Sequence, residues 1–283
     1  MSSIIPTPRE ITDDEVRSFQ ENDWAKIESF LSEDEAAALL TRLEAKLEQS
    51  AEKGGHAVYG PMLEALGPLS VEGVSGEVAD RFFFDMTHQR AWGQAAARLL
   101  GVESVRYQID QGLIKRPARD GGDGTVWHVD FGGQEPGSLF ASHGSAFAPA
   151  RSVIAFWIAL KPTPATSGTM RFVAPRHFDQ PLHDLVHATY AEQKSIEESY
   201  EELEQRGILS PPLDLKPGDA TVHRGALHSA PPNKGDGIRW AFAVSYVQAD
   251  VHYTGLIDEL VMAGVDGLEK GKTLPDHRFH IIG

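Results

Sequence analysis

The sequence predicts a mainly β fold with flanking helices, built on a double-stranded β-helix core of the jelly-roll, cupin-like kind. Apolar residues at helical spacing are concentrated before residue 100, whereas short apolar runs bounded by turn residues dominate from 104 to 250. Helices packed outside an antiparallel core of short strands fit this architecture, which leaves one end open for a ligand. The chain has 283 residues, 41% of them hydrophobic, and can bury one sizeable core. We therefore expect a single domain over residues 1–283.

Three segments predict an amino-terminal helical region at about residues 10–100, packed on the core. Residues 13–22, 33–53 and 88–100 each carry apolar side chains at helical spacing. Ser32 stands just before the second segment and Glu35 follows three residues later, which is the pattern of a capping box. We expect this helix to begin directly after Ser32.

The predicted barrel core, residues 104–250, starts with an extended run from Ser104 to Lys115 and a glycine-rich turn at 120–124. Residues 182–206 interrupt the later strands as a helical insertion. Its portion 189–205 is strongly acidic, which favours a solvated helix face, with a lid over the substrate as the alternative. The segments 131–150 and 182–206 exceed the length of a hairpin connection, and we expect both to order when substrate binds.

One imidazole and one carboxylate, His128 and Asp130, stand two residues apart on the extended segment that follows the glycine-rich turn. Side chains two apart on a strand point to the same side, so these two can take adjacent positions on one metal. The composition gives about two His-x-Asp/Glu pairs by chance. The other pair is His177 and Asp179, which follows Pro175 in a turn-like context. The strand context therefore favours His128 and Asp130.

A second imidazole, His228, follows the Gly218-Asp219 turn and the strand at 220–224. With His128 and Asp130 it completes two histidines and one carboxylate, a ligand set typical of iron(II) oxygenases. His223 is the alternative distal ligand, but no arginine follows it at the matching offset.

Arg239 lies eleven residues after His228 and opens the apolar strand 240–247. A buried guanidinium needs an anionic partner. The far carboxylate of 2-oxoglutarate would bind its planar fork in a bidentate manner. A structural ion pair with Asp219 or Asp250 is the alternative.

Together these motifs resemble the phytanoyl-CoA dioxygenase (PhyH) family of iron(II)/2-oxoglutarate-dependent oxygenases. The resemblance runs from about residue 10 to the carboxyl end, with further similar segments at 11–35, 153–160, 167–177 and 266–279, the last like bacterial members. Two departures concern the co-substrate region. Family members often carry Ser where this chain has Ala230, with its hydroxyl at Ser229 instead, and the Pro-Gly-Ser-His segment reads Ala-Pro-Arg-His here.

The resemblance implies a dioxygenase that uses iron(II), 2-oxoglutarate and dioxygen to hydroxylate a small organic molecule, or to oxidise a C–H bond in a related way, with release of succinate and CO2. A secondary-metabolite intermediate is the expected substrate. Within this site we expect His128, Asp130 and His228 to be catalytic metal ligands and Arg239 to anchor the co-substrate. Other expected contacts are Gln111, Lys115, Ser229 and Trp157 with the co-substrate, and Trp127 and Phe131 with the substrate.

The net charge of −15 argues against nucleic acid or an anionic membrane as a partner, because both need a positive surface. The scarcity of basic clusters also makes an acyl-CoA hydroxylase the less favoured alternative. A non-catalytic or zinc-binding cupin-like protein would have no reason to keep Arg239, and a halogenase would lack the Asp130 carboxylate. No signal or membrane segment is recognisable and cysteine is absent, so a cytoplasmic location is expected. The sequence gives no oligomeric state.

Overall fold

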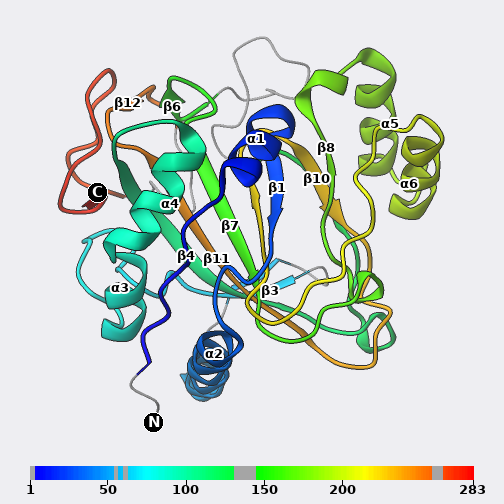
Figure 1. The fold of residues 1–283 in the computed structure, drawn as a ribbon. Coiled ribbons are helices and arrows are strands. Elements are labelled where there is room, and N and C mark those ends of the chain that lie inside the picture. The colour runs from blue at the N-terminus through cyan, green and yellow to red at the C-terminus, as the bar shows by residue number, and fades with distance from the viewer. Residues whose placement is uncertain (1–3, 54–56, 60–62, 131–144, 257–263) are drawn as a thin grey trace.

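The computed structural model describes residues 4–53, 57–59, 63–130, 145–256 and 264–283. Within these ranges, eight strands form a major antiparallel sheet, three form a minor sheet, and two more pair separately (Figure 1). The predicted double-stranded β-helix is confirmed. The major sheet has the order β1 (Trp24–Ile27), β9 (Ala220–His223), β7 (Val153–Ala159), β11 (Arg239–Gln248), β4 (Val105–Lys115), β3 (Leu63–Leu66), β2 (Ala57–Tyr59), with β13 (Ile281–Ile282) paired to β4. The minor sheet has the order β5 (Thr125–His128), β10 (Leu227–Ala230), β8 (Arg171–Val173), and the third pair is β12 (His252–Tyr253) with β6 (Phe147–Ala148).

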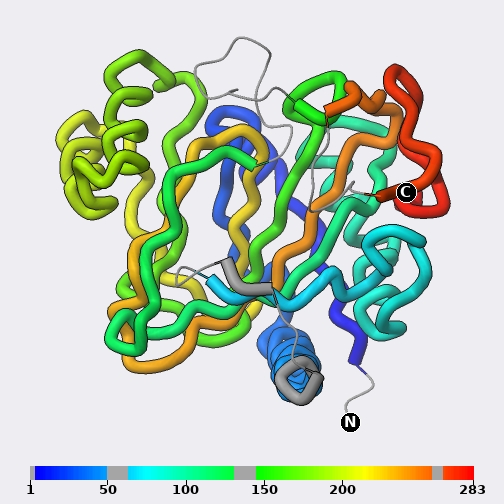
Figure 2. Tube along the Cα trace, turned by 180° about the vertical axis from the view of Figure 1, so that it is seen from behind, coloured from blue at the N-terminus to red at the C-terminus, as the bar shows by residue number. Residues whose placement is uncertain are grey.

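The amino-terminal helices follow the predicted pattern, with one correction. Helices α1 (Asp13–Asn22) and α2 (Glu33–Lys53) have the predicted bounds, and Ser32 and Glu35 exchange the hydrogen bonds of a capping box. The helix expected at 88–100 is shorter. It begins as α4 (Arg90–Leu100), after a separate helix α3 (Arg81–Thr87) that is capped by Asp80. Figure 2 shows the carboxyl end close to α3 and α4 on one flank of the molecule.

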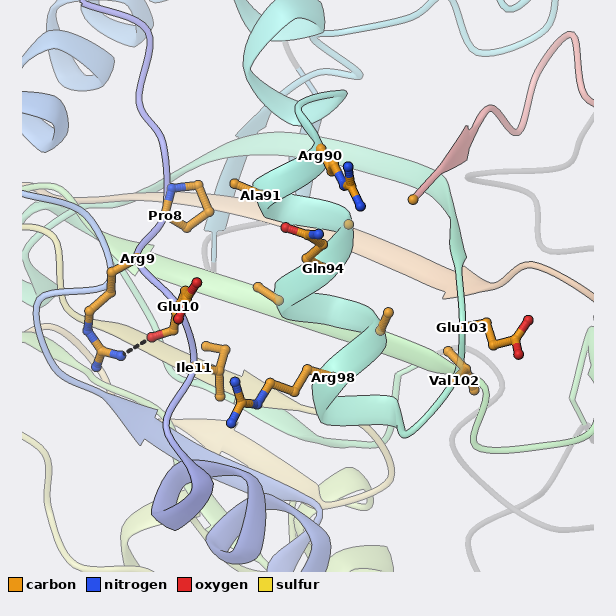
Figure 3. Close-up of a pocket in the computed structure, with 14 residues that line it drawn as sticks. Pro8, Arg9, Glu10, Ile11, Arg90, Ala91, Gln94, Arg98, Val102 and Glu103 are labelled. Carbon is orange, nitrogen blue, oxygen red and sulfur yellow. Dashed lines mark hydrogen bonds between the residues drawn. The ribbon is translucent and has the colours of Figure 1, made fainter.

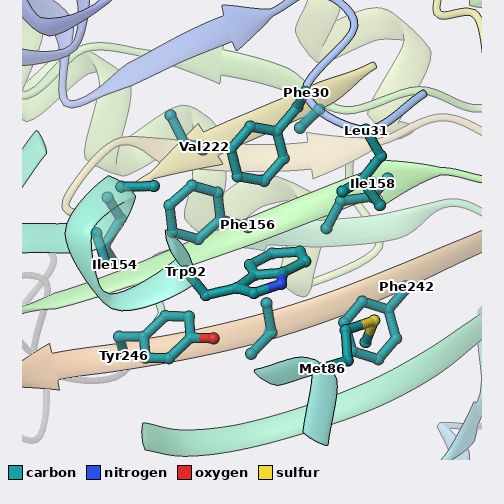
Figure 4. Close-up of a cluster of buried hydrophobic side chains, with 14 of the residues drawn as sticks. Phe30, Leu31, Met86, Trp92, Ile154, Phe156, Ile158, Val222, Phe242 and Tyr246 are labelled. Atoms are coloured by element: carbon teal, nitrogen blue, oxygen red, sulfur yellow. The ribbon is translucent and has the colours of Figure 1, made fainter. Parts of the chain in front are cut away.

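The major sheet separates the hydrophobic core from the candidate site because successive side chains alternate between its two faces. On β7, Ile154, Phe156 and Ile158 point towards the helices, where they pack around Trp92 (Figure 4). The odd-numbered residues of β4, β7, β9 and β11 point the other way. They line a cavity between the sheets and include Ile109, Gln111, Leu113, Val153, Ala155, Trp157, His223, Arg239, Ala243 and Ser245.

The insertion at 182–206 consists of two helices, α5 (Gln180–Tyr190) and α6 (Ile196–Gln205), so the prediction of one helix over 189–205 is wrong. The turn between them ends at Ser195, whose side chain caps α6. Both helices cover the outer face of the minor sheet, on the flank opposite α3 and α4 (Figure 1). Leu203 of α6 is fully buried there, whereas Glu201 is exposed. The described helices form an outer layer in this structure, and a lid function stays a prediction.

The packing of α6 makes a prediction about stability. Leu203→Ala should lower the free energy of unfolding by about 2–5 kcal/mol, because it removes apolar contacts and leaves a cavity. Glu201→Ala on the same helix should change it by less than about 0.5 kcal/mol, since that side chain is solvated. Urea denaturation of the two variants measures both values. Equal stability of the Leu203 and Glu201 variants would contradict the packing of α6 on the sheet.

No helix in the described part of the chain has the length and apolar character needed to span a bilayer.

Candidate functional site

Two histidines and one aspartate converge where the minor sheet faces the cavity. His128 ends β5, Asp130 follows it by two residues, and His228 lies on β10 directly opposite His128 in the strand register. One ligand atom from each residue lies within 4.8 Å of the other two. The structure thus brings together the three residues that the sequence singled out: the β5–β10 pairing sets the two histidines opposite each other, and Asp130 lies just beyond the end of β5.

Hydrogen bonds to backbone carbonyls fix the two imidazoles. The Nδ1 atom of His128 lies 2.8 Å from the carbonyl oxygen of Val126, and Nδ1 of His228 lies 3.1 Å from that of Ala226. A carbonyl oxygen only accepts, so each Nδ1 carries the proton and each Nε2 keeps a free lone pair. Both Nε2 atoms face Oδ1 of Asp130, at 3.6 and 3.7 Å. In this tautomer the two Nε2 atoms and Oδ1 of Asp130 can all act as metal ligands, and they face one point.

The electrostatics of the cluster suit a cation. Burial and the neighbouring imidazoles hold the pKa of His228 well below its usual value, so this ring is neutral. Burial alone would raise the pKa of the Asp130 carboxyl, but the surrounding imidazoles, among them His223 through its hydrogen bond, lower it below its usual range. Neutral imidazoles and an ionised carboxylate are the protonation states that a divalent metal requires.

The cluster opens into a cavity of about 360 Å³ with mainly apolar walls. Besides the three clustered residues, Gln111, Trp157, His223, Ser229 and Arg239 line this cavity, together with apolar residues that include Leu63, Ile109, Leu113, Val153 and Met170. A cavity with apolar walls and a few converging polar groups is typical of a small-molecule site.

Two buried basic side chains, one of which lines this cavity, lie side by side on neighbouring strands. Arg239 on β11 is directly opposite Lys115 on β4, and their exposed fractions are 5% and 0%. Nη1 of Arg239 donates to the carbonyl oxygen of Gly168, whereas its Nε has no hydrogen-bond partner. The guanidinium carbon lies 5.0 Å from the centre of the Trp157 ring. Among the described residues, neither side chain forms an ion pair with a carboxylate.

Burial without a counter-ion lowers the pKa of both side chains. It lowers the pKa of Arg239 to about 9. Burial, reinforced by the charge of Arg239, lowers the pKa of Lys115 to about 6. The alternative partners of Arg239 are engaged elsewhere. Asp219 accepts hydrogen bonds from the backbone of Ser29 and Lys216, and Asp250 accepts one from Gln248.

The remaining predicted residues divide into those near the cavity and those away from it. Lys115 Nζ donates to Thr125 Oγ1 and to the carbonyl oxygen of Ala230, both at 3.3 Å, and the Ser229 hydroxyl shares a 2.7 Å hydrogen bond with Tyr200.

Trp127 does not line the cavity. Its ring is buried under α6, where Nε1 donates to Ser199 Oγ at 2.8 Å. This position corrects the predicted contact of Trp127 with substrate.

Strand alternation explains the misplacement of Trp127: it adjoins His128, and neighbouring side chains on a strand point to opposite faces. Phe131 lies outside the described residues. The second His-x-Asp pair is structural, because Asp179 caps α5 through the backbone of Leu182 and pairs with Arg206.

The site also contains a residue whose role the sequence did not predict. His223 Nε2 lies 2.8 Å from Oδ2 of Asp130. The sequence predicts a strand at His223 and disfavours this residue as the distal ligand, and no pattern in the sequence predicts the contact with Asp130. His223 belongs to the major sheet and Asp130 follows a strand of the minor sheet, and only the tertiary structure brings them together.

A second cavity, of about 460 Å³, lies between residues 8–11 and α4 (Figure 3). Two of its arginines already have carboxylate partners, since Arg9 pairs with Glu15 and Arg98 with Asp13. It contains none of the residues predicted for the site. The cavity beside the histidine–aspartate cluster is therefore the candidate active site.

Solved structures share the fold at low sequence identity. The carbocyclase SnoK from nogalamycin biosynthesis, described as a non-heme alpha ketoglutarate dependent enzyme, is 20% identical, with 98% of each chain covered and a TM-score of 0.67. The epimerase SnoN in complex with Fe3+, alpha ketoglutarate and nogalamycin RO is 17% identical, with 96% of this chain and 98% of that chain covered and a TM-score of 0.69. EctD from S. alaskensis with 2-oxoglutarate and 5-hydroxyectoine is 14% identical, with coverage of 93% and 88% and a TM-score of 0.62.

A comparison with curated protein sequences finds no match. The family model described as phytanoyl-CoA dioxygenase (PhyH) matches residues 19–241, which is most of the chain. This range includes the major and minor sheets up to the start of β11, with the histidine–aspartate cluster and Arg239. The chain belongs to the phytanoyl-CoA dioxygenase (PhyH) family.

Proposed function

We propose that the protein is a non-haem iron(II)/2-oxoglutarate-dependent dioxygenase that oxidises a small organic molecule, with release of succinate and CO2. The observation that carries this proposal is an apolar cavity that contains a two-histidine, one-carboxylate cluster and the buried Arg239, with the buried Lys115 beside Arg239 and no carboxylate partner for either basic side chain among the described residues. The first feature fits a metal and the second fits a carboxylate. An oxo-acid that chelates iron at one end and carries a carboxylate at the other satisfies both.

In this proposal His128, Asp130 and His228 would hold iron(II), a metal for which two histidines and one carboxylate are a typical ligand set. When bound, iron supplies the activation of dioxygen that is coupled to decarboxylation of 2-oxoglutarate. The protein contributes by orienting the two imidazoles through their Nδ1 protons and by keeping the carboxylate ionised. A zinc-binding or non-catalytic protein of this fold could keep the three ligands, but the unpaired Arg239 and Lys115 would then have no function.

The far carboxylate of 2-oxoglutarate would bind between Arg239 and Lys115. The unpartnered Nε of Arg239 offers one donor, and the contact with Trp157 holds the guanidinium plane in place. Lys115 supplies a second positive charge from the facing strand. Gln111 and Ser229 line the same cavity and would make the remaining polar contacts.

The lowered pKa of Lys115 makes a testable prediction. With a pKa of about 6 the free side chain is mostly neutral at pH 8, and a carboxylate beside it favours the charged form. Binding of 2-oxoglutarate to the Zn(II)-loaded protein at pH 8 should therefore take up about one proton, and affinity should fall by up to about tenfold per pH unit above pH 6, until the pKa of the complex is reached. Calorimetry in buffers of different ionisation enthalpy measures the uptake. The same uptake in Lys115→Met would contradict this assignment.

The cavity walls bear on the substrate class. They are mostly apolar, and the two buried basic side chains are assigned to the co-substrate, which favours a small neutral molecule over an acyl-CoA with its several phosphate charges. The fold neighbours SnoK and SnoN come from nogalamycin biosynthesis, which supports a secondary-metabolite intermediate as substrate. Succinate production from 2-oxoglutarate, with iron(II) and ascorbate, tests the activity. Candidate substrates should raise the rate above the slow uncoupled level, whereas no succinate under any condition would favour the binding-protein alternative.

A further inference from the structure

His223 contacts the metal-binding carboxylate from the opposite sheet. Its Nε2 lies 2.8 Å from Oδ2 of Asp130, while Oδ1 of the same carboxylate faces the Nε2 atoms of His128 and His228. A carboxylate oxygen that is ionised only accepts, so Nε2 of His223 donates the proton. The two oxygens of Asp130 therefore have different partners: one faces the metal position and the other accepts from His223.

The fold holds His223 rigidly. It is the last residue of β9, paired with Trp24 on β1 and with Ala155 on β7, and only 4% of the residue is exposed. Its ring lies 4.4 Å from the ring of His228 and 5.7 Å from that of Phe172, which in turn stacks on Trp24. Asp130, by contrast, lies beyond the end of β5, and its side chain is 28% exposed. The buried His223 thus donates a hydrogen bond to Asp130, a carboxylate that the strand pairing of β5 does not hold in place.

We propose that His223 is a positioning residue that keeps Asp130 bound to the metal through Oδ1 alone. This inference rests on the proposed function, because it assigns the role of a neighbour of the metal ligands. Without the hydrogen bond, the carboxylate could rotate and bind the metal through both oxygens. A second carboxylate oxygen would take one of the positions that the co-substrate and dioxygen need. Loss of a residue that hydrogen-bonds to a metal ligand typically weakens metal binding by about 10–100-fold.

The other ring nitrogen of His223 supports this assignment. Nδ1 is buried and has no hydrogen-bond partner, so Asp130 is the only described group to which the ring is bonded. A buried nitrogen without a partner costs stability, so the contact with Asp130, rather than stabilisation of the fold, accounts for a histidine at this position.

Two variants of similar volume separate the hydrogen bond from packing. In His223→Gln the side-chain amide can donate to Asp130 as Nε2 does, whereas His223→Leu fills the space without a donor. Thr221→Val is the matched control, because Thr221 lies on the same face of the same strand, is equally buried, and its hydroxyl has no partner. The measurements are Co(II) affinity of the apoprotein and the ligand-field absorption of the Co(II) complex, which reports the number and arrangement of ligands.

We expect His223→Leu to bind Co(II) about 10–100-fold more weakly with a changed spectrum, and His223→Gln and Thr221→Val to stay within about threefold of the parent protein. Wild-type affinity and spectrum in His223→Leu would overturn the proposal, as would a Gln variant as weak as Leu. Loss of all binding in both His223 variants would make His223 a ligand and also overturn it. If His223→Leu fails to fold, the Co(II) affinity of His223→Gln is compared with that of the parent protein, and a loss of more than about threefold overturns the proposal. Failure of the parent protein to bind metal would instead refute the proposed function.

Discussion

Replacing His128, Asp130 or His228 with Ala should reduce 2-oxoglutarate turnover to below about one-hundredth of the parent rate and weaken iron(II) binding by at least as much. Each substitution removes one of three protein atoms that face the metal position, and loss of a mere hydrogen-bonding partner of a ligand already costs about 10–100-fold. Anaerobic metal titration and a succinate assay measure the two effects.

His177→Ala is the control for these variants. His177 belongs to the chain's other His-x-Asp pair and lies outside the cluster. The iron affinity and the turnover of the His177→Ala protein should therefore stay at the parent level. If His177→Ala lost activity while His128→Ala kept it, the assignment of the metal centre would be wrong.

Arg239→Ala should raise the KM for 2-oxoglutarate by at least about 30-fold while iron(II) affinity stays within about threefold. Truncating one partner of a buried charge pair costs about 2–5 kcal/mol, and here the other partner would be the co-substrate itself. Arg239→Lys should fall in between, because an ammonium supplies the charge without the planar fork. Steady-state kinetics in 2-oxoglutarate distinguishes the three proteins.

Arg106 provides the matched control for Arg239. It is equally buried, with 5% exposed, but its guanidinium pairs with Asp276 away from the cavity. Arg106→Ala should lower stability without changing the KM for 2-oxoglutarate. Unchanged kinetics in Arg239→Ala, or the same change in both variants, would contradict the anchor role.

Local patterns were sufficient for the parts of the site that depend on one strand. Alternation along β5 predicts that His128 and Asp130 share a face, and the same alternation places Lys115 and Gln111 together on β4. Applied to its neighbour, the rule would also have turned Trp127 away from the cavity. The apolar opening of β11 indicated that Arg239 is buried and in need of an anion.

Features that depend on how the sheets pack could not be read from local patterns. The contact between His223 and Asp130 links the major sheet to the segment that follows β5 of the minor sheet, and no spacing in the chain encodes it. The pairing of Arg239 with Lys115 depends on the register of two strands that are far apart in sequence. The break between α5 and α6 was missed because helical spacing continues through residues 191–195, where Ser195 starts a new helix by capping it.

The most direct test of the proposed function is the visible absorption of the anaerobic protein titrated first with iron(II) and then with 2-oxoglutarate. Chelation of iron(II) by the 1-carboxylate and 2-oxo groups produces a metal-to-ligand charge-transfer band, which neither component gives alone. We predict that this band appears with the parent protein, requires both additions, and is lost in Asp130→Ala. A parent protein that binds iron(II) but develops no band at saturating 2-oxoglutarate would contradict the assignment of an oxo-acid-dependent oxygenase.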